Sequence, residues 1–369
     1  MATASSYRDQ IEMNPDAFMR YQMYGDMDAV RAQMAAYISG NPSGLVFVPN
    51  ASSGVNAVLR SLRPPSSGKN KILYLDTEYM MTQNTLNYIS TSAGFQDALL
   101  KLHMTFPTSN EDIINTVVAG LEANKDEVYL AVFSHINSCP GIILPVKELI
   151  EACHARGIMV LVDGAHVLGH IPLNVTDLDA DFYVSNGHKW LYTPKGSAIL
   201  YVKEQYQSLI YPAVISEEGT GSTHLQFEFS WTGTMDYAPF LSFPNALAWR
   251  DQFGGDANIM NYIHQLAITG GNILINAWGT EKLVSDDMIG AMVNVRLPVA
   301  DPSSFNAAIF EQNILSQFNT WIPAFPITIN GGSPQYFTRV CAQIYNEESD
   351  YVYLANSVLA LLAEMKQLA

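Results

Sequence analysis

Short apolar runs alternate with helix-like segments over the first two hundred residues, and this alternation constrains the fold most. Seven runs have the length and composition of buried strands: Leu45–Val48 and residues 71–75, 98–104, 128–133, 158–162, 181–184 and 197–202. Strands that alternate with helices form βαβ units, which build a mostly parallel sheet. We therefore predict an α/β fold with a mostly parallel seven-stranded sheet flanked by helices.

The segments between the runs show helical periodicity. The stretch "PNASSGVNAVLRSL" after the first run carries apolar residues at i, i+3, i+4 and i+7, namely Val55, Val58, Leu59 and Leu62. The same spacing recurs after the fourth run, in Val146, Leu149, Ile150 and Cys153. This pattern predicts amphipathic helices that bury one face.

The pattern changes after about residue 239. Helical segments at 245–253 and 258–267 are followed by a strand-like run at 291–298 and an apolar helix at 351–368. This order predicts a smaller α+β domain. We expect an N-terminal segment over residues 1–25, a large domain over 26–240 and a small domain over 241–369.

Charge and cysteine content limit the partners and the compartment. The chain has 19 Lys+Arg against 35 Asp+Glu, a net charge of −16, which argues against binding to nucleic acid or an anionic membrane. No apolar stretch reaches the length of a membrane span, and no signal peptide opens the chain. Three scattered cysteines are too few for a disulfide framework or a zinc site, so we expect a reducing, cytosolic compartment and no metal.

Three of the predicted strands end in polar residues, where ligands collect in parallel sheets. The first is followed by "NASSG", whose Ser52 and Ser53 open a helix and can either bind a phosphate or simply cap the helix. The fifth ends in "DGAH", where Asp163 needs a cation or strong donors, or serves only as a cap. After the sixth, "SNGHKW" holds Lys189, which can form an imine or reach the surface.

Together these residues fit the needs of pyridoxal phosphate. This cofactor requires a lysine for its aldehyde, an acid that keeps its ring nitrogen protonated, and a cradle for its phosphate. The spacing from Asp163 to Lys189 leaves room for one crossover between adjacent strands. We therefore predict a pyridoxal-phosphate site at this edge of the sheet.

The stretch "VDGAHVLGHIPLNVTDLDADFYVSNGHKW" is similar to the active-site region of the class V, fold type I, pyridoxal-phosphate enzymes. Further family-like pieces follow in the family's order: "VPNASSGVNAVLRSL", "SHINSCPGIILPV", "WTGTMDYAPFLSFPNALAW" and "RVCAQIYN". Judged by "NPDAFMR" and "WTGTMDY", the chain most resembles the isopenicillin N epimerase-like branch, beside hercynylcysteine sulfoxide lyase. The resemblance implies fold type I and a homodimer.

The resemblance implies roles for residues around the cofactor. Lys189 forms the imine and then moves the α-proton of the substrate, and Asp163 pairs with the ring nitrogen. His166 contacts the phenolic oxygen. The phosphate is held by a larger set, in which Thr234 acts from the neighbouring subunit: Ser52, Ser53, Asn186, His188 and Thr234.

Further roles concern the substrate. Tyr79 matches the aromatic residue stacked on the cofactor and can also donate a proton; packing against the sheet is the alternative, and we favour the functional role. Arg339, in "RVCAQIYN", matches the arginine that binds the substrate α-carboxylate as a two-point fork. Arg20 either binds a second carboxylate or tethers the N-terminal segment, and we favour the tether.

Two departures from the family pattern bear on activity. A cysteine desulfurase needs a mobile cysteine on the loop before the carboxylate arginine, and residues 321–338 contain none. Cys341 is expected to be an apolar filler and Cys139 is a candidate acid, so persulfide chemistry is not expected. Only "MATASS" precedes "YRDQIEMNP", where relatives carry an Asn/Gly-rich pocket segment, so another element closes the pocket or activity is reduced.

These observations predict a lyase that acts on an amino acid. The first expectation is β-elimination at the sulfur-bearing side chain of an S-substituted cysteine or its sulfoxide. Epimerisation is the alternative, since it uses the same residues, followed by desulfurase-like or aminotransferase activity. A non-catalytic scaffold is a further alternative, but it should have lost Lys189 or Asp163.

Overall fold

The structure is a computed structural model that describes residues 2–91, 98–216 and 221–368. The chain forms two compact units. The first comprises Met1–Leu102, Ile114–Ile136 and Pro145–Asp256, and the second comprises His103–Ile113, Asn137–Leu144 and Ala257–Ala369. Two short segments of the N-terminal half therefore belong to the same unit as the C-terminal third.

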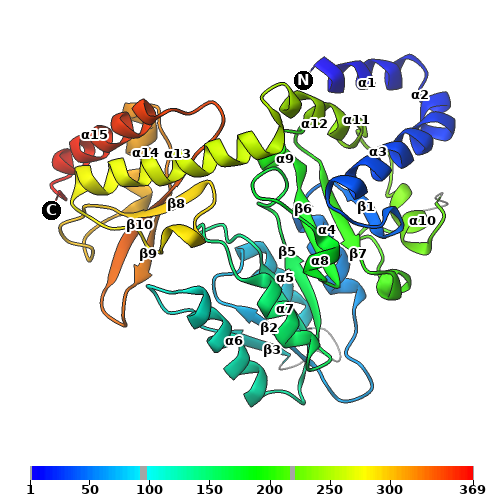
Figure 1. Cartoon of the computed structure of the whole chain (residues 1–369), viewed down its shortest axis with the longest axis horizontal. Helices are drawn as coiled ribbons and strands as arrows, with labels where there is room; N and C mark the ends of the chain where they lie inside the picture. The colour runs from blue at the N-terminus through cyan, green and yellow to red at the C-terminus, as the bar shows by residue number, and fades with distance from the viewer. Residues whose placement is uncertain (1, 92–97, 217–220, 369) are drawn as a thin grey trace. The chain divides into compact units, whose positions relative to one another are not determined.

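The first unit contains the predicted seven-stranded sheet (Figure 1). Its strands are β1 (Leu45–Val48), β2 (Lys71–Leu75), β3 (Leu99–Leu102), β4 (Val128–Ser134), β5 (Met159–Asp163), β6 (Phe182–Asn186) and β7 (Ala198–Val202). The spatial order is β1-β7-β6-β5-β4-β2-β3. The run from β3 to β6 is parallel, whereas β7 pairs antiparallel with both β6 and β1. The predicted fold class is confirmed.

Helices accompany this sheet as the apolar spacing predicts. Before residue 254 they are α1 (Ala2–Met13), α2 (Pro15–Ala17), α3 (Met23–Tyr37), α4 (Ala51–Ser61), α5 (Met80–Ser90), α6 (Asn110–Ala123), α7 (Val146–His154), α8 (Val175–Leu178), α9 (Gly187–Trp190), α10 (His224–Ser230), α11 (Ala238–Leu241) and α12 (Phe243–Asp251). The predicted faces of α4 and α7 are both buried. Burial of these side chains attaches α4 to β1, β5, β6 and β7, and α7 to β4 and β5.

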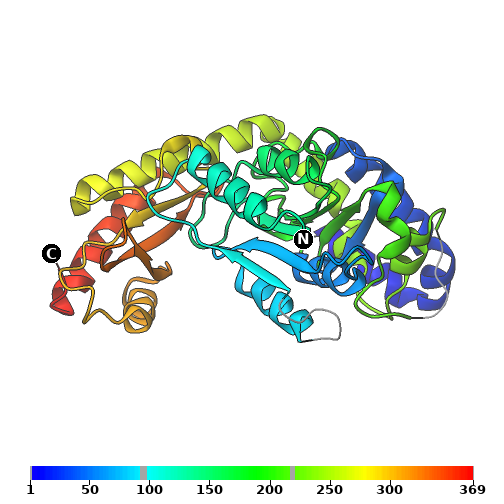
Figure 2. The ribbon, with the colours of Figure 1, turned by 90° about the horizontal axis from the view of Figure 1, so that it is seen from below.

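The second unit is built on a three-stranded antiparallel sheet of order β8-β10-β9. Its strands are β8 (Met292–Arg296), β9 (Ala324–Thr328) and β10 (Pro334–Cys341), and its helices are α13 (Gly255–Trp278), α14 (Ala307–Phe318) and α15 (Glu348–Glu364). Helices α14 and α15 lie side by side (Figure 2). Gly270 lets α13 approach α15, because a Cβ there would come within 2.4 Å of the Tyr351 ring.

Two expectations for the second unit need correction. The helix predicted over 351–368 ends at Glu364, because the chain turns at Lys366 with φ 56°. The Gln367 carbonyl then accepts a hydrogen bond from the Ala300 N–H at 2.8 Å. The helix predicted over 258–267 is longer than its apolar spacing indicates, since α13 has 24 residues.

No helix in the described ranges combines the length and apolarity that a membrane span requires.

Candidate functional site

The ends of β5 and β6 bring three of the predicted residues together. Asp163 is the last residue of β5, His166 follows in the next turn, and Lys189 lies in the single helical turn α9 directly after β6. The Lys189 Nζ lies 3.1 Å from the His166 Nε2. Because β5 and β6 are parallel neighbours, their polar ends meet at the same edge of the sheet.

Hydrogen bonding fixes the tautomer of His166. The indole Nε1–H of Trp190 donates to His166 Nδ1 at 3.2 Å, and indole can only donate. Nδ1 is therefore an acceptor, so the proton of the neutral ring is on Nε2. The Nε2 atom faces the Lys189 amine at 3.1 Å, so the ring and the amine lie side by side at this edge of the sheet.

Asp163 is almost fully buried, with 3% of its surface exposed. Its Oδ1 accepts from the Ala165 N–H at 3.0 Å, and its Oδ2 accepts from the Thr82 hydroxyl at 3.4 Å. Burial raises the pKa of Asp163, while the Ala165 N–H and the Lys189 charge oppose this rise. A buried carboxylate with few strong donors suits a cationic ligand, such as a protonated ring nitrogen.

The turn before α4 is the start of a helix, and its cap is not a serine. Asn50 caps the helix, and its Oδ1 accepts from Ser53 N–H at 2.8 Å and Ser53 Oγ–H at 3.0 Å. Ser52 and Ser53 lie half-buried in the first turn. The Asn186 Oδ1 accepts from the Ala51 N–H at 2.9 Å and so ties the end of β6 to this turn. The contacts with phosphate that are predicted for Ser52, Ser53 and Asn186 stay predictions.

The other predicted residues are more dispersed. His188 is directed at the backbone, with Nδ1 2.8 Å from the Ser197 carbonyl, and burial lowers its pKa. Tyr79 precedes α5 and is 50% exposed. Thr234 is exposed. Arg20 is exposed and pairs at 3.5 Å with Asp16, four residues earlier in the same segment. The predicted roles of these four residues are untested by this geometry.

An ion pair absent from the sequence-based expectations fixes the N-terminal segment. The Arg8 Nε lies 2.8 Å from the Asp236 carboxylate, which connects α1 to the residues just before α11. Asp236 belongs to "TGTMDY", the motif that also holds Thr234. Arg8 therefore contributes to tethering the N-terminal segment, and the role predicted for Arg20 stays a prediction.

Arg339 lies on β10 in the second unit. Its Nη1 donates to the Ser138 carbonyl at 2.5 Å and to the Ser138 hydroxyl at 3.2 Å. Its Nε is buried and has no hydrogen-bond partner in the described part of the chain. Arg339 also lines a cavity of about 360 Å³ together with Trp321, Cys341 and Tyr351. A buried guanidinium nitrogen without a partner fits an incoming carboxylate.

Sequence patterns did not reveal a polar cluster next to Asp163. Glu78 binds Ser134 at the end of β4, and the His135 Nδ1 lies 2.9 Å from the Tyr183 hydroxyl. The one available signal was position, since Glu78 follows β2 by three residues and Ser134 ends β4. Thr82, which contacts Asp163, sits inside α5 and gave no signal.

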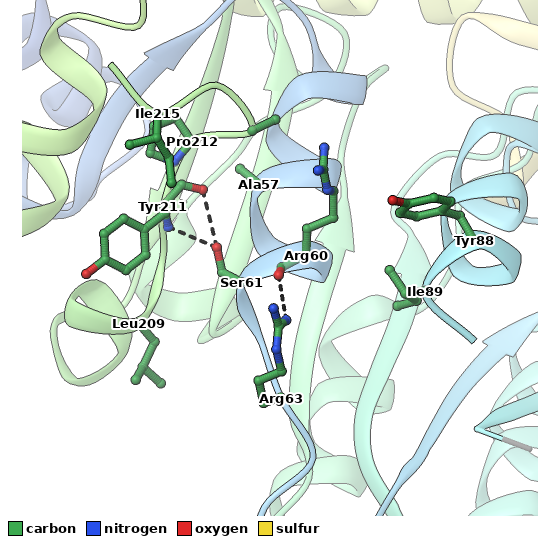
Figure 3. Close-up of a pocket in the computed structure, with 11 residues that line it drawn as sticks. Ala57, Arg60, Ser61, Arg63, Tyr88, Ile89, Leu209, Tyr211, Pro212 and Ile215 are labelled. Atoms are coloured by element: carbon green, nitrogen blue, oxygen red, sulfur yellow. Dashed lines mark hydrogen bonds between the residues drawn. The ribbon is translucent and has the colours of Figure 1, made fainter. Parts of the chain in front are cut away.

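A separate cavity of about 560 Å³ opens at the other end of α4 (Figure 3). Arg60 and Arg63 line it, and the Ser61 hydroxyl accepts from the Tyr211 N–H at 2.9 Å. The turn with Asn50 is at the N-terminus of α4, whereas these residues are at its C-terminal end. This cavity is therefore not part of the cluster around Lys189.

Arg250, which is 1% exposed, binds the turn that carries Lys189. Its two terminal nitrogens donate to the Trp190 and Gly169 carbonyls, both at 2.9 Å, and its Nε pairs with Asp256. Gly169 has φ 80°, and a Cβ there would come within 2.5 Å of the Trp190 carbonyl. One guanidinium thus fixes the loop after β5 and the turn after β6.

Replacing Arg250 with methionine is expected to lower the unfolding free energy by about 3 kcal/mol. The change leaves two carbonyls and the Asp256 carboxylate without their buried partner. Thermal unfolding should show a melting temperature lower by roughly 6–12 °C. Arg8→Met is the matched control: its ion pair with Asp236 is exposed, so the loss should stay within about 1 kcal/mol. Equal losses in both variants would contradict this assignment.

No group of three or more histidine, cysteine or acidic side chains suited to a metal ion occurs in the parts of the chain that the structure describes.

Comparison with known proteins identifies related chains. A family model described as aminotransferase class-V matches residues 16–317. An L-cysteine desulfhydrase from Arabidopsis thaliana is 30% identical over 344 residues, which cover 86% of this chain and 74% of the relative. Hercynylcysteine sulfoxide lyase from Schizosaccharomyces pombe is 25% identical and covers 95% of this chain and 87% of its own length. Isopenicillin N epimerase from Streptomyces clavuligerus is 27% identical, covering 98% and 90%.

Solved structures share the fold. The complex of the cystine C–S lyase C-DES with its product cysteine persulfide superposes with a TM-score of 0.75 over 100% of this chain and 93% of that one. The sequence identity is 17%, so this similarity concerns the fold alone.

Proposed function

Because the chain belongs to the class V aminotransferase family of pyridoxal-phosphate enzymes, we propose that it is a carbon–sulfur lyase. The substrate is an S-substituted cysteine or its sulfoxide, and the reaction is β-elimination. The predictions of family, fold type and cofactor are confirmed. Support for the reaction comes from the names of the relatives, among which are a cysteine desulfhydrase and a sulfoxide lyase.

The observation that carries the proposal is the arrangement of Lys189, His166 and Asp163. The Lys189 amine lies 3.1 Å from the His166 Nε2, and a buried carboxyl group ends the neighbouring strand. These are the groups that the aldehyde, the phenolic oxygen and the ring nitrogen of pyridoxal phosphate require. The residues present therefore fit the cofactor.

The cofactor, when bound, supplies an electron sink for the bonds around the substrate α-carbon. Lys189 holds the cofactor and takes the α-proton, and Asp163 keeps the ring nitrogen protonated. The helix dipole of α4, with Ser52 and Ser53, holds the phosphate, and Asn186, His188 and Thr234 are its further proposed contacts. His166 donates to the phenolic oxygen.

Two residues are proposed to act on the substrate. Arg339 binds the α-carboxylate through donors that include its buried Nε. Tyr79, whose side chain is half exposed, stacks on the cofactor and donates a proton to the departing sulfur. Arg20 is proposed to tether the N-terminal segment, with binding of a second substrate carboxylate as its alternative role.

Desulfurase-like chemistry is disfavoured because residues 321–338, the stretch before Arg339, contain no cysteine, and the Cys139 thiol gives a second reason. Desolvation raises the pKa of the Cys139 thiol, and the nearby Arg339 charge only partly opposes this rise. A persulfide-forming cysteine must be a thiolate, which a raised pKa works against. We also propose that the enzyme is a cytosolic homodimer whose Thr234 reaches the partner's phosphate. This part rests on the sequence pattern and the three free cysteines.

The test is keto-acid release. Purified protein with added pyridoxal phosphate is given S-substituted cysteines and their sulfoxides, and pyruvate is measured. Pyruvate release that requires Lys189 supports elimination and ranks the side chains. Exchange of the α-proton from deuterated water without pyruvate would instead identify an epimerase, which the relative from Streptomyces clavuligerus makes the second candidate. Absence of both would contradict an enzymatic role.

A further inference from the structure

Glu78 is a buried acid that the proposed reaction does not use. It lies in the turn between β2 and α5 and is 3% exposed. Its Oε1 accepts from the Ser134 N–H at 2.7 Å, and its Oε2 is hydrogen-bonded to the Ser134 hydroxyl at 2.6 Å. Both oxygens are thus fixed on one residue at the end of β4.

Ser134 brings Glu78 close to Asp163. Ser134 and Asp163 are direct partners in the parallel pairing of β4 with β5, so their side chains project from the same face of the sheet. The next residue, His135, donates its N–H to the Asp163 carbonyl at 2.9 Å. Two buried carboxyl groups therefore lie after β2 and at the end of β5, the two strands that flank β4, although the cofactor needs only one of them.

The other titratable groups around this pair do not neutralise Glu78. Burial lowers the pKa of His135 to about 4, so its ring is uncharged at neutral pH. Burial also raises the pKa of Tyr183, its hydrogen-bond partner, well above the usual value. The Lys189 amine, when it carries a charge, interacts with Asp163. Asp76, two residues before Glu78 in the same turn, contributes a further acid.

We propose that Glu78 is a positioning residue that sets the negative charge beside Asp163 by its own protonation. While Glu78 is neutral, Asp163 is the carboxylate that faces the cofactor ring. Once Glu78 ionises, a second negative charge stabilises the protonated forms of the nearby cationic groups. The assignment of the ring nitrogen to Asp163 rests on the proposed function, whereas the ionisation of Glu78 does not.

Glu78 is expected to ionise within the pH range over which unfolding can be measured. Burial raises the pKa of Glu78 to about 8, the bonds from Ser134 lower it, and the Asp163 charge raises it. Between the ordinary glutamate value of 4.5 and about 8, the folded chain keeps a proton that the unfolded chain has lost. Glu78 therefore makes the fold less stable as the pH rises through this window.

The first test uses the cofactor-free protein and does not depend on any activity. Melting temperatures of the wild type and of Glu78→Gln are measured from pH 5 to pH 9. Glutamine keeps the shape and the contacts with Ser134 but cannot ionise. We expect the melting temperature of the variant to exceed that of the wild type by a margin that grows up to about pH 8 and then levels off. A difference that stays constant across the range would overturn the ionisation of Glu78.

The second test uses the cofactor-loaded protein and reads the visible absorbance of the bound cofactor against pH. Glu78→Gln should shift the alkaline midpoint down by roughly one pH unit, since the second negative charge is missing. Coinciding titration curves would leave Glu78 ionisable but overturn its effect on the cofactor. Failure of the protein to bind the cofactor would instead count against the proposed function.

Ser134→Ala provides a second variant in case the glutamine variant does not fold. It removes the hydroxyl but keeps the backbone N–H that binds Oε1. This hydroxyl lowers the pKa of Glu78. Its loss should therefore raise the pH at which the Glu78-dependent fall of the melting temperature levels off. An unchanged point would contradict the proposal.

Discussion

Lys189→Ala is expected to lower kcat for pyruvate release by about 10³-fold or more, because the group that takes the α-proton is lost. The covalent link to the cofactor should be lost as well. Borohydride reduction followed by mass spectrometry should therefore add the mass of the cofactor to the wild type but not to the variant. The fold should be retained, since the half-buried Lys189 side chain lies at the sheet edge rather than in the core.

The matched control is Lys195→Ala, six residues further along the same loop. Lys195 is exposed and its Nζ donates to the His188 carbonyl at 3.1 Å, so it neighbours the site without facing His166. Its replacement should leave kcat within about twofold, as surface substitutions usually do little. If the Lys189 variant releases pyruvate at the wild-type rate, the scaffold alternative replaces the lyase.

Asp163→Asn is expected to reduce kcat/KM by about 10²–10³-fold, because a fixed charge that stabilises the transition state is removed. The same change should not reduce stability at neutral pH. The folded pKa of Asp163 is raised by burial, so its ionisation costs stability as the pH rises above its ordinary value, and asparagine does not ionise. Kinetics and thermal unfolding of the same preparation check both statements.

Asp181→Asn is the control for a buried aspartate on the neighbouring strand segment. Asp181 is 2% exposed, accepts from the Val160 N–H at 2.7 Å and pairs with His154 and Lys203. Its replacement should lower the melting temperature but leave kcat/KM of the folded protein unchanged. A variant of Asp163 that keeps its activity, or that loses it only by unfolding, would refute the role assigned to this residue.

The sequence was most informative where one physical requirement decides the structure. Buried strands need apolar runs, so β1 and β2 were predicted with their observed bounds. Amphipathic helices need a regular apolar face, and the predicted faces of α4 and α7 are buried. Asp163, His166 and Lys189 could be found because polar side chains at strand ends of a parallel sheet converge.

Other features depend on contacts that the local sequence does not encode. Glu78 reads as an ordinary turn residue until β2 and β4 are placed side by side. Strand β9 is half exposed and contains Pro326, so it gives a weak strand signal. Helix α15 ends before its apolar pattern does, because pairing with residue 300 takes over. The ion pair of Arg8 with Asp236 joins side chains 228 positions apart, which no local pattern encodes.

The single guanidinium of Arg250 also has a consequence for local opening. It closes the loop after β5 and the turn after β6 on the same side chain, through the Gly169 and Trp190 carbonyls. Neither segment can swing out without breaking its hydrogen bond to Arg250 and the bond from the Trp190 indole to His166, which joins the two segments. The amide protons of the two segments should therefore exchange with solvent as one cooperative unit, with a common opening free energy. Lys189 and His166 would then leave their native positions together when this unit opens, and neither would do so alone.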